Sequence, residues 1–282
     1  MSHPAIQEVV AVFGQPVAGN PTQYMMEKAF AQVGLDWRYL TLEVAPEVLG
    51  DAIAGMRAMG FRGCNLTIPH KVEVIKFLDR TSEAATLMGA VNCVNRVGTE
   101  LVGDNTDGKG FVQSLRSLTD PAGRNVVILG AGGAARAIAV EVGLAGAAQI
   151  TVVNRAVERG QELVNLLNDK VHVASRYVKW EGAFEVPPES EVVINATSIG
   201  LGDAEARVPL AVNTLEPDMV VADVIFNPPE TRLIRDARQR GCQTLDGLGM
   251  LVNQAVIGFK IWTGRDADPG VMRDALEEFL GL

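Results

Sequence analysis

A glycine-rich turn between an apolar strand and a helix is the sequence feature that most constrains the fold of this chain. The apolar run from Asn125 to Leu129 predicts a buried strand, and an alanine-rich helix is expected from about Ala134 to Leu144. Between them stands Gly130-Ala131-Gly132-Gly133-Ala134-Ala135, which fits the pattern G-x-G-x-x-(G/A) in its strand–turn–helix context. Residues this small let backbone N–H groups and a helix N-terminus approach a pyrophosphate.

The same small residues have a second interpretation, in which they only let the helix pack tightly on the strand. Both flanking elements are present, and this context favours dinucleotide binding over packing alone. The predicted cofactor-binding residues of the turn are Gly130, Ala131, Gly132, Gly133 and Ala134.

The end of the next predicted strand indicates which dinucleotide binds. Sites for NAD usually place a carboxylate there, about 20 residues after the turn, to hold the ribose 2′-hydroxyl. Here the strand ends in Asn154-Arg155, and Arg159 follows. Arginines bind phosphate through charge-assisted hydrogen bonds, so NADP is predicted and NAD is less favoured. In the alternative, Arg155 and Arg159 pair with Glu158 or Glu162 on a solvated helix face.

Alternating strands and helices on both sides of the turn predict an α/β fold of two domains. A chain of 282 residues exceeds the usual size of one core. Residues 1–108 predict a mainly parallel sheet that binds substrate and is completed by C-terminal helices within 247–282. Residues 109–246 predict a doubly wound, Rossmann-type domain for the cofactor.

Composition narrows the class of partner and the compartment. The formal net charge is −9 without a run of Lys or Arg, which disfavours nucleic acid and anionic membrane surfaces. Cys64, Cys93 and Cys242 are widely separated, so reduced thiols are expected rather than a disulfide framework or a zinc site. No signal segment or long apolar run is visible, and a cytoplasmic protein is expected.

A second group of polar residues follows a predicted strand of the first domain. Asn65-Leu66-Thr67-Ile68-Pro69-His70-Lys71 ends that strand, where an open parallel sheet normally binds its ligand. Asn92 and Asp107 stand in segments expected to be loops. Together these residues offer a cation, a carboxylate and neutral donors to a polyhydroxylated ring, although each alone is more often a surface or capping residue.

Several separate motifs in this order carry a family resemblance. They are Phe13-Gly14-Gln15-Pro16, Asn65-Leu66-Thr67-Ile68-Pro69-His70-Lys71, Gly89-Ala90-Val91-Asn92, Asp104-Asn105-Thr106-Asp107-Gly108, the glycine turn, Asn154-Arg155, Asn195-Ala196-Thr197-Ser198-Ile199-Gly200, Asp223-Val224-Ile225-Phe226-Asn227-Pro228 and Gly247-Leu248-Gly249-Met250-Leu251-Val252-Asn253-Gln254. Along nearly its whole length the chain resembles shikimate dehydrogenases.

The resemblance implies an NADP-dependent oxidoreductase that interconverts shikimate and its 3-dehydro ketone by hydride transfer. It implies that Lys71 takes the hydroxyl proton and that Asp107 orients the reacting group, with no need for a metal ion. It further implies that Thr67, Asn92 and Gln254 bind ring hydroxyls, and that Thr197, Ser198 and Gly247 lie beside the nicotinamide.

One loop departs from the family pattern. The family usually has His-Ser-x-Ser-Pro after its first Gly-x-Pro, and the two serines hold the substrate carboxylate. An ungapped alignment puts Gly19 at the His, Asn20 and Thr22 at the serines, and Gln23 at the Pro. Asn20 and Thr22 retain polar groups that can bind substrate with different geometry. Phe226 stands where the family often has Tyr.

These departures leave the preferred substrate open between shikimate and a related acid such as quinate or an aminated analogue. A dinucleotide-binding regulatory protein of low activity is the alternative from another class. Methylene-tetrahydrofolate dehydrogenases share the architecture, but the complete motifs disfavour them. A monomer and a homodimer are both compatible with the sequence.

Overall fold

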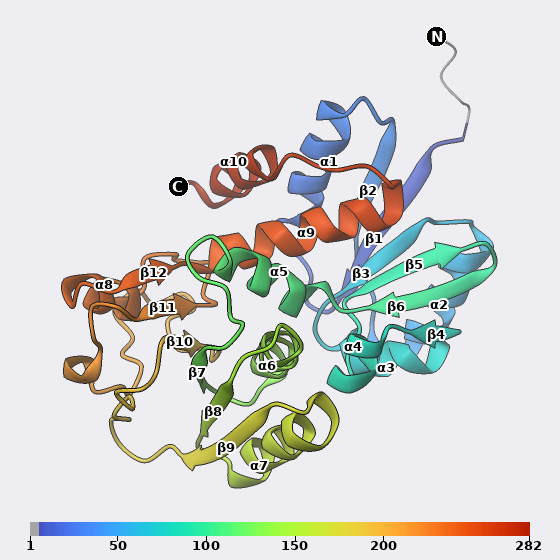
Figure 1. Cartoon of the computed structure of the whole chain (residues 1–282). Coiled ribbons are helices and arrows are strands. Elements are labelled where there is room, and N and C mark those ends of the chain that lie inside the picture. The colour runs from blue at the N-terminus through green and yellow to red at the C-terminus, as the bar shows by residue number, and fades with distance from the viewer. Residues whose placement is uncertain (1–5) are drawn as a thin grey trace. The chain divides into compact units, whose positions relative to one another are not determined.

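The computed structural model describes residues 6–282 and divides the chain into two compact units. The first comprises residues up to Thr106 together with Gln254–Leu282, and the second is Asp107–Asn253. The two units divide within helices α5 (Thr106–Leu115) and α9 (Gly247–Thr263), whereas the sequence placed the domain boundaries after residues 108 and 246. The elements of both units are labelled in Figure 1.

The first unit is built on a six-stranded sheet in the order β2-β1-β3-β5-β6-β4. β1 pairs in parallel with both β2 and β3, whereas β5 is antiparallel to β3 and β6. β5 and β6 form a hairpin that turns at Gly98. The strands are β1 (Glu8–Gly14), β2 (Trp37–Glu43), β3 (Gly63–Leu66), β4 (Arg80–Thr81), β5 (Cys93–Val97) and β6 (Glu100–Asp104).

Helices bury both faces of this sheet. Ala11 and Phe13 lie in a core cluster with Leu49, Ile53 and Met56 of α2. On the opposite face the rings of Phe30 in α1 and Phe259 in α9 lie 5.4 Å apart. The helices of this unit, besides its part of α9, are α1 (Thr22–Gln32), α2 (Leu49–Ala58), α3 (His70–Glu73), α4 (Glu83–Met88) and α10 (Pro269–Leu280).

The second unit has an all-parallel sheet in the order β12-β11-β10-β7-β8-β9. The chain winds outward from β7 in both directions, which confirms the predicted doubly wound fold with its switch point between β7 and β10. The strands are β7 (Asn125–Leu129), β8 (Gln149–Asn154), β9 (Ala174–Lys179), β10 (Val192–Asn195), β11 (Val220–Asp223) and β12 (Gln243–Leu245). The helices within it are α6 (Gly133–Leu144), α7 (Val157–Leu166) and α8 (Arg232–Gln239).

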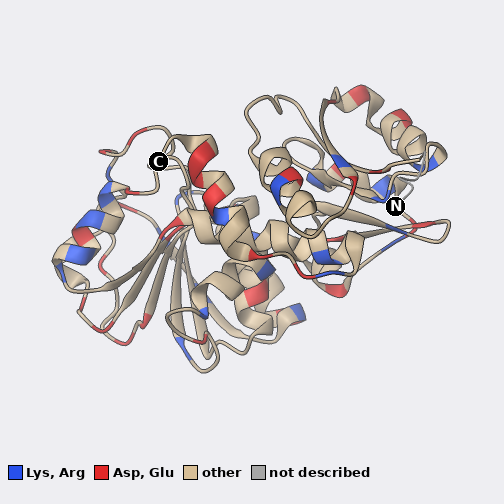
Figure 2. Ribbon diagram, turned by 90° about the horizontal axis from the view of Figure 1, so that it is seen from above, with Lys and Arg blue, Asp and Glu red and all other residues tan. Residues whose placement is uncertain are grey.

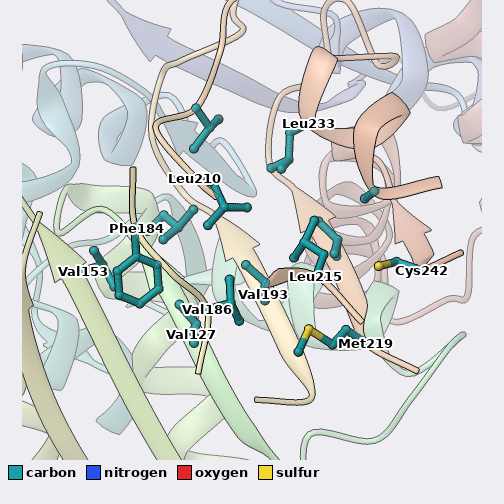
Figure 3. Close-up of a cluster of buried hydrophobic side chains, with 14 of the residues drawn as sticks. Val127, Val153, Phe184, Val186, Val193, Leu210, Leu215, Met219, Leu233 and Cys242 are labelled. Carbon is teal, nitrogen blue, oxygen red and sulfur yellow. The ribbon is translucent and has the colours of Figure 1, made fainter. Parts of the chain in front are cut away.

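One core of this unit lies between the sheet and the irregular segments that follow β9 and β10. Val127, Val153 and Val193 project from three strands toward Phe184 and Leu210 (Figure 3). Alternate residues of a strand point to opposite faces, so the continuous apolar runs of β7 and β10 bury both faces of the sheet.

Helix α5 corrects the prediction that Asp107 lies in a polar loop. Thr106–Leu115 is helical despite two glycines in Thr-Asp-Gly-Lys-Gly, which are poor helix formers. A Cβ at Gly108 would lie 2.3 Å from the Ala137 carbonyl oxygen, so glycine permits this helix to lie against α6. Close packing against α6 thus outweighs the low helix propensity of the two glycines. Asp107 lies in the first turn of α5.

Acidic and basic residues are interspersed along the ribbon of both units (Figure 2). Helix α8 holds a local concentration of arginines that the sequence patterns did not single out. These are neutralised locally: Arg232 and Arg235 contact Glu205, and Arg238 contacts Glu230. The positive charge of α8 is thus paired rather than presented as a basic surface.

Cys64, Cys93 and Cys242 are all free and buried. Burial raises the pKa of Cys64 and of Cys242, which keeps both protonated. Over residues 6–282, no helix is both long enough and apolar enough to cross a lipid bilayer.

Candidate active site

The glycine turn combines one packed glycine with two open ones. Gly130 has φ +110°, and its position for a Cβ lies 3.0 Å from the Ala196 carbonyl oxygen. At Gly132 and Gly133, by contrast, a Cβ would meet nothing within 4 Å. Tight packing therefore accounts for Gly130 only. The other two glycines border open space at the N-terminus of α6, where N–H groups can receive a phosphate.

Arg155 and Arg159, which follow β8, are exposed. Asn154, at the end of β8, is held by two hydrogen bonds. Asn154 Nδ2 donates to the Ala156 carbonyl at 2.8 Å, and the Tyr177 hydroxyl donates to the Asn154 carbonyl at 2.9 Å. Glu162 pairs with Arg136 at 3.2 Å. Within residues 6–282 neither Arg155 nor Arg159 forms an ion pair, which disfavours the interpretation that they only neutralise Glu158 or Glu162.

The residues expected beside the nicotinamide follow β10 and begin α9. Thr197 is half-buried, Ser198 is exposed, and the Thr197 methyl carbon would lie 3.1 Å from a Cβ at Gly130. Gly247 donates its N–H to the Ile225 carbonyl at 3.2 Å, and a Cβ there would lie 2.4 Å from that carbonyl oxygen. Phe226, in place of the family's frequent Tyr, is partly exposed on the adjoining segment.

Sequence reasoning missed the buried carboxylate at the centre of this region. Asp223 is 1% exposed and accepts hydrogen bonds from Asn195 Nδ2, the Ile225 N–H and the Thr231 hydroxyl. Burial raises the pKa of Asp223 from 3.8 to about 6, although the three donors oppose this effect. The motifs contained Asp223 and Asn195, but sequence alone does not reveal that these side chains meet.

In the first unit, the carboxyl ends of β1 and β3 bring two of the motifs together. A Cβ at Gly14 would lie 2.3 Å from the Thr67 methyl carbon, and the Gln15 N–H donates to the Ile68 carbonyl at 2.9 Å. Thr67 is half-buried at this edge. Only glycine at position 14 allows the two loops to approach so closely.

Lys71 lies in the short helix α3, which is hydrogen-bonded to segments that flank strands of the sheet. The Val91 N–H donates to the Lys71 carbonyl at 2.7 Å, and the His70 N–H donates to the Thr67 carbonyl at 2.8 Å. The buried ring of His70 has Nε2 2.8 Å from the Val44 carbonyl oxygen, a contact that sequence reasoning did not identify. These contacts hold the half-buried Lys71 near Thr67 and the segment preceding Asn92.

Asn92 connects this edge to the start of α5. Its Oδ1 accepts from the Thr106 N–H at 2.7 Å, and its Nδ2 donates to the Thr106 hydroxyl at 3.0 Å. The Asn92 carbonyl also accepts from the Leu66 N–H at 2.9 Å. Asn92 therefore fixes the residue that immediately precedes Asp107. The remaining predicted ligand, Gln254, is 6% exposed in α9.

The loop that departs from the family pattern begins α1. Asn20 Oδ1 accepts from the Thr22 N–H at 2.9 Å, so the amide nitrogen of Asn20 is the donor that faces away from this contact. Thr22 is 5% exposed at the first position of α1. Asn20 and Thr22 stand where the family pattern has two serines. The carbonyl oxygen of the Asn20 side chain stabilises the turn before α1.

Comparisons with known proteins identify the family. Residues 12–94 match the shikimate dehydrogenase substrate binding domain, residues 113–201 match shikimate / quinate 5-dehydrogenase, and residues 247–277 match the shikimate 5′-dehydrogenase C-terminal domain. Shikimate dehydrogenase (NADP(+)) of Methanopyrus kandleri is 39% identical over 278 residues, which cover 96% of each chain. The chain belongs to the shikimate dehydrogenase family.

Two solved structures of this family's fold differ in what they are named for. The ligand-free form of 5-ketofructose reductase of Gluconobacter sp. strain CHM43 is 50% identical, with a TM-score of 0.96 and coverage of 98% of this chain and 99% of that one. Shikimate 5-dehydrogenase from Thermus thermophilus, in complex with NADP(H) and shikimate, is 32% identical, with a TM-score of 0.84 and coverage of 97% and 100%.

The predicted family, its α/β fold class and its assignment as an oxidoreductase are therefore confirmed. The predicted cofactor is confirmed at the level of the family, because the curated relatives are named for NADP(+). The individual site residues stay predictions.

The buried carboxyl of Asp223 predicts a specific pH dependence of stability. The folded protein holds a proton on Asp223 between about pH 4 and pH 6, where the unfolded chain does not, so this contribution to stability is present below about pH 4 and lost as pH rises through about 6. We expect the unfolding free energy of the wild type, relative to Asp223→Asn, to fall by up to about 3 kcal/mol from pH 4 to pH 7. Urea unfolding at a series of pH values measures it, and a difference that stays flat or rises contradicts the assignment.

Proposed function

We propose that the chain is an NADP-dependent oxidoreductase that interconverts a secondary hydroxyl group and a ketone on shikimate or a closely related cyclitol acid. The observation that carries the proposal is the grouping of Thr67, Lys71 and Asn92 at the carboxyl edge of the first sheet. Asn92 bonds to Thr106, and the carboxylate of Asp107 follows directly along the chain. The first unit then binds substrate and the second binds cofactor.

The cofactor assignment within this proposal rests on the open side of the glycine turn. Gly132 and Gly133 leave space at the N-terminus of α6, which suits a pyrophosphate. Arg155 and Arg159, both exposed and without acidic partners among residues 6–282, suit the 2′-phosphate that distinguishes NADP from NAD. Ala131, Ala134 and Asn154 belong to the same proposed cofactor site. Thr197, Ser198 and Gly247 adjoin the nicotinamide.

The proposed chemistry assigns one proton to Lys71. NADP, when bound, supplies a nicotinamide ring that takes up or returns a hydride. During oxidation the neutral amine of Lys71 accepts the hydroxyl proton as the C–O bond gains double-bond character, and during reduction its ammonium returns a proton to the forming alkoxide. Asp107 accepts a hydrogen bond from the reacting hydroxyl and fixes its orientation. Thr67, Asn92 and Gln254 bind the other hydroxyls.

Replacement of Lys71 tests this role directly. We expect Lys71→Ala to lower kcat by about two decades or more, because the proton then has no positioned acceptor, while the KM for NADP changes little. Lys76→Ala is the matched control, since Lys76 lies in the next turn, is exposed and pairs with Glu73 at 2.6 Å. Initial rates from nicotinamide absorbance measure both variants. An unchanged kcat for Lys71→Ala removes the assignment.

A second candidate substrate is a neutral keto sugar, and a specific observation favours it. The reductase that is 50% identical to this chain is named for 5-ketofructose, which carries no carboxylate. The chain also lacks the two serines that hold the carboxylate in the family pattern. The Thr22 N–H is used in its bond to Asn20 Oδ1, and Thr22 is only 5% exposed, so the Asn20 amide nitrogen is the more accessible donor where the family pattern has two serine hydroxyls. A neutral substrate needs no such pair.

A substrate panel distinguishes the two candidates. Wild-type protein is assayed with NADP⁺ and shikimate or quinate, and with NADPH and 5-ketofructose, alongside the double variant Asn20→Ser/Thr22→Ser. We expect turnover by the wild type, and we expect the double variant to raise kcat/KM for shikimate by about one to two decades, because paired serine hydroxyls return about 1 to 3 kcal/mol of carboxylate binding.

Each outcome of the panel has a clear meaning. A higher kcat/KM for 5-ketofructose in the wild type assigns the second candidate, and a higher value for a cyclitol acid assigns the first. Absence of turnover on every substrate, despite measurable NADPH binding, rejects the enzyme in favour of a dinucleotide-binding regulatory protein. A double variant that leaves shikimate kinetics unchanged rejects the role of Asn20 and Thr22.

The proposal includes a cytoplasmic location, which rests on the three reduced cysteines. It includes a small molecule as the binding partner, in keeping with the net charge of −9 and the paired arginines of α8. Monomer and homodimer are equally compatible with it.

A further inference from the structure

The carboxylate of Asp223 joins three segments of the second unit. Its Oδ1 accepts from Asn195 Nδ2 at 2.9 Å and from the Ile225 N–H at 3.1 Å, and its Oδ2 accepts from the Thr231 hydroxyl at 2.8 Å. β10 and β11 pair in parallel with Asn195 opposite Asp223, so the two side chains leave the sheet at the same edge. The proposed reaction assigns no role to Asp223.

The first of these contacts sets the direction of a hydrogen-bond chain. A carboxylate only accepts hydrogen bonds, so Asn195 must turn its NH₂ group toward Asp223 and its carbonyl oxygen away. That oxygen accepts from the Thr197 hydroxyl at 2.7 Å and from the Thr197 N–H at 3.2 Å. The Thr197 hydroxyl in turn accepts from the Ile199 N–H at 3.1 Å. Asp223 thereby fixes the orientation of Thr197 through Asn195.

The oriented Thr197 lies against the glycine turn. With its hydroxyl bonded to Asn195, Thr197 has its methyl carbon 3.1 Å from the Cβ position of Gly130. β10 also pairs with β7 so that Asn195 stands opposite Leu129, the residue before Gly130. The series of hydrogen bonds that starts at Asp223 therefore ends beside the glycine turn, where the cofactor is proposed to bind.

The other two contacts reach the remaining segments on this side. The Ile225 N–H is fixed by Asp223, and the Ile225 carbonyl accepts from the Gly247 N–H at 3.2 Å. Thr231 caps α8 by accepting from the Ile234 N–H at 3.3 Å, and its methyl carbon would lie 3.2 Å from a Cβ at Gly200. Thr197 and Gly247 thus each form a hydrogen bond with a residue that is itself bonded to Asp223.

We propose that Asp223 is a positioning residue for the nicotinamide end of the cofactor, acting through Asn195 on Thr197 and through Ile225 on Gly247. The inference rests on the proposed function, because that function assigns Thr197 and Gly247 to the nicotinamide. Asp223 is 1% exposed, and in this proposal it acts only through these partners rather than by contact with cofactor or substrate. Its effect is therefore confined to one half of the dinucleotide.

A purely structural carboxylate would behave differently. Burial of a carboxylate is unfavourable, and an apolar residue of similar volume would fill the same space with less desolvation. An apolar side chain would leave Asn195 Nδ2 with only its longer bond to the Ile199 carbonyl at 3.3 Å, so the acceptor of Thr197 would be held less firmly. If Asp223 served only to hold the fold together, its removal would weaken binding of both halves of NADP equally.

The test separates the two halves of the cofactor by binding alone. Dissociation constants for NADPH and for 2′,5′-ADP, which carries only the adenine half, are measured by titration calorimetry. The proteins are the wild type, Asp223→Ala, Asn195→Ala and Asp223→Asn. Thr151→Val is the matched control, because Thr151 is buried in β8 and its hydroxyl accepts from Arg176 Nε outside this chain of contacts.

We expect Asp223→Ala and Asn195→Ala to weaken NADPH binding about tenfold, which corresponds to about 1.4 kcal/mol, and to leave 2′,5′-ADP binding within about twofold. Asp223→Asn is expected to recover most of the loss, because one amide oxygen can still accept from Asn195 and Ile225. The fluorescence of bound NADPH should shift in the two alanine variants and not in Thr151→Val.

Several results overturn the inference. Equal weakening of both ligands shows a structural role only, and unchanged NADPH binding shows no role. Asn195→Ala supplies the same comparison of the two ligands if Asp223→Ala does not fold. A wild type that binds NADPH but turns over no substrate rejects the proposed reaction while leaving this inference to the binding data, and a wild type that binds no NADPH rejects both.

Discussion

The parallel register of β7, β10 and β11 is the constraint on which the rest of the second unit depends. Leu129, Asn195 and Asp223 end three adjacent strands in line with one another, so the segments that follow them leave the sheet at one edge. The glycine turn follows the first, the Thr197 loop the second, and the Ile225 turn the third. An open α/β sheet binds ligands at such an edge, and here buried hydrogen bonds hold the segments in place.

The first unit uses the same principle with a different sheet. β1 and β3 are parallel and end beside each other, whereas β5 is antiparallel and begins at that edge. Asn92 consequently meets Leu66 through its backbone and Thr106 through its side chain. This arrangement explains how residues from distant motifs meet through hydrogen bonds at one edge of the sheet. It also explains why Gly14 cannot carry a side chain, since Thr67 occupies the space.

The sequence predicted the elements with strong apolar patterns and the residues within specific motifs. The glycine turn, β7 and the doubly wound order follow from local patterns that the structure contains. Helix α5 was missed because its glycines suit a loop, and packing against α6 decides the matter. The contacts of Asp223, Asn195 and His70 were missed because they join elements that are distant in the sequence, which no local pattern encodes.

Binding of NADP at the glycine turn underlies both the proposed reaction and the role of Asp223, and the most direct measurement is the relative affinity of the wild-type protein for NADP⁺ and NAD⁺. Titration calorimetry at one pH and ionic strength gives both dissociation constants. Because Arg155 and Arg159 have no acidic partners among residues 6–282, they should add charge-assisted bonds to the 2′-phosphate. We predict that NADP⁺ binds about tenfold more tightly or better. Equal affinities, or tighter binding of NAD⁺, would contradict this assignment.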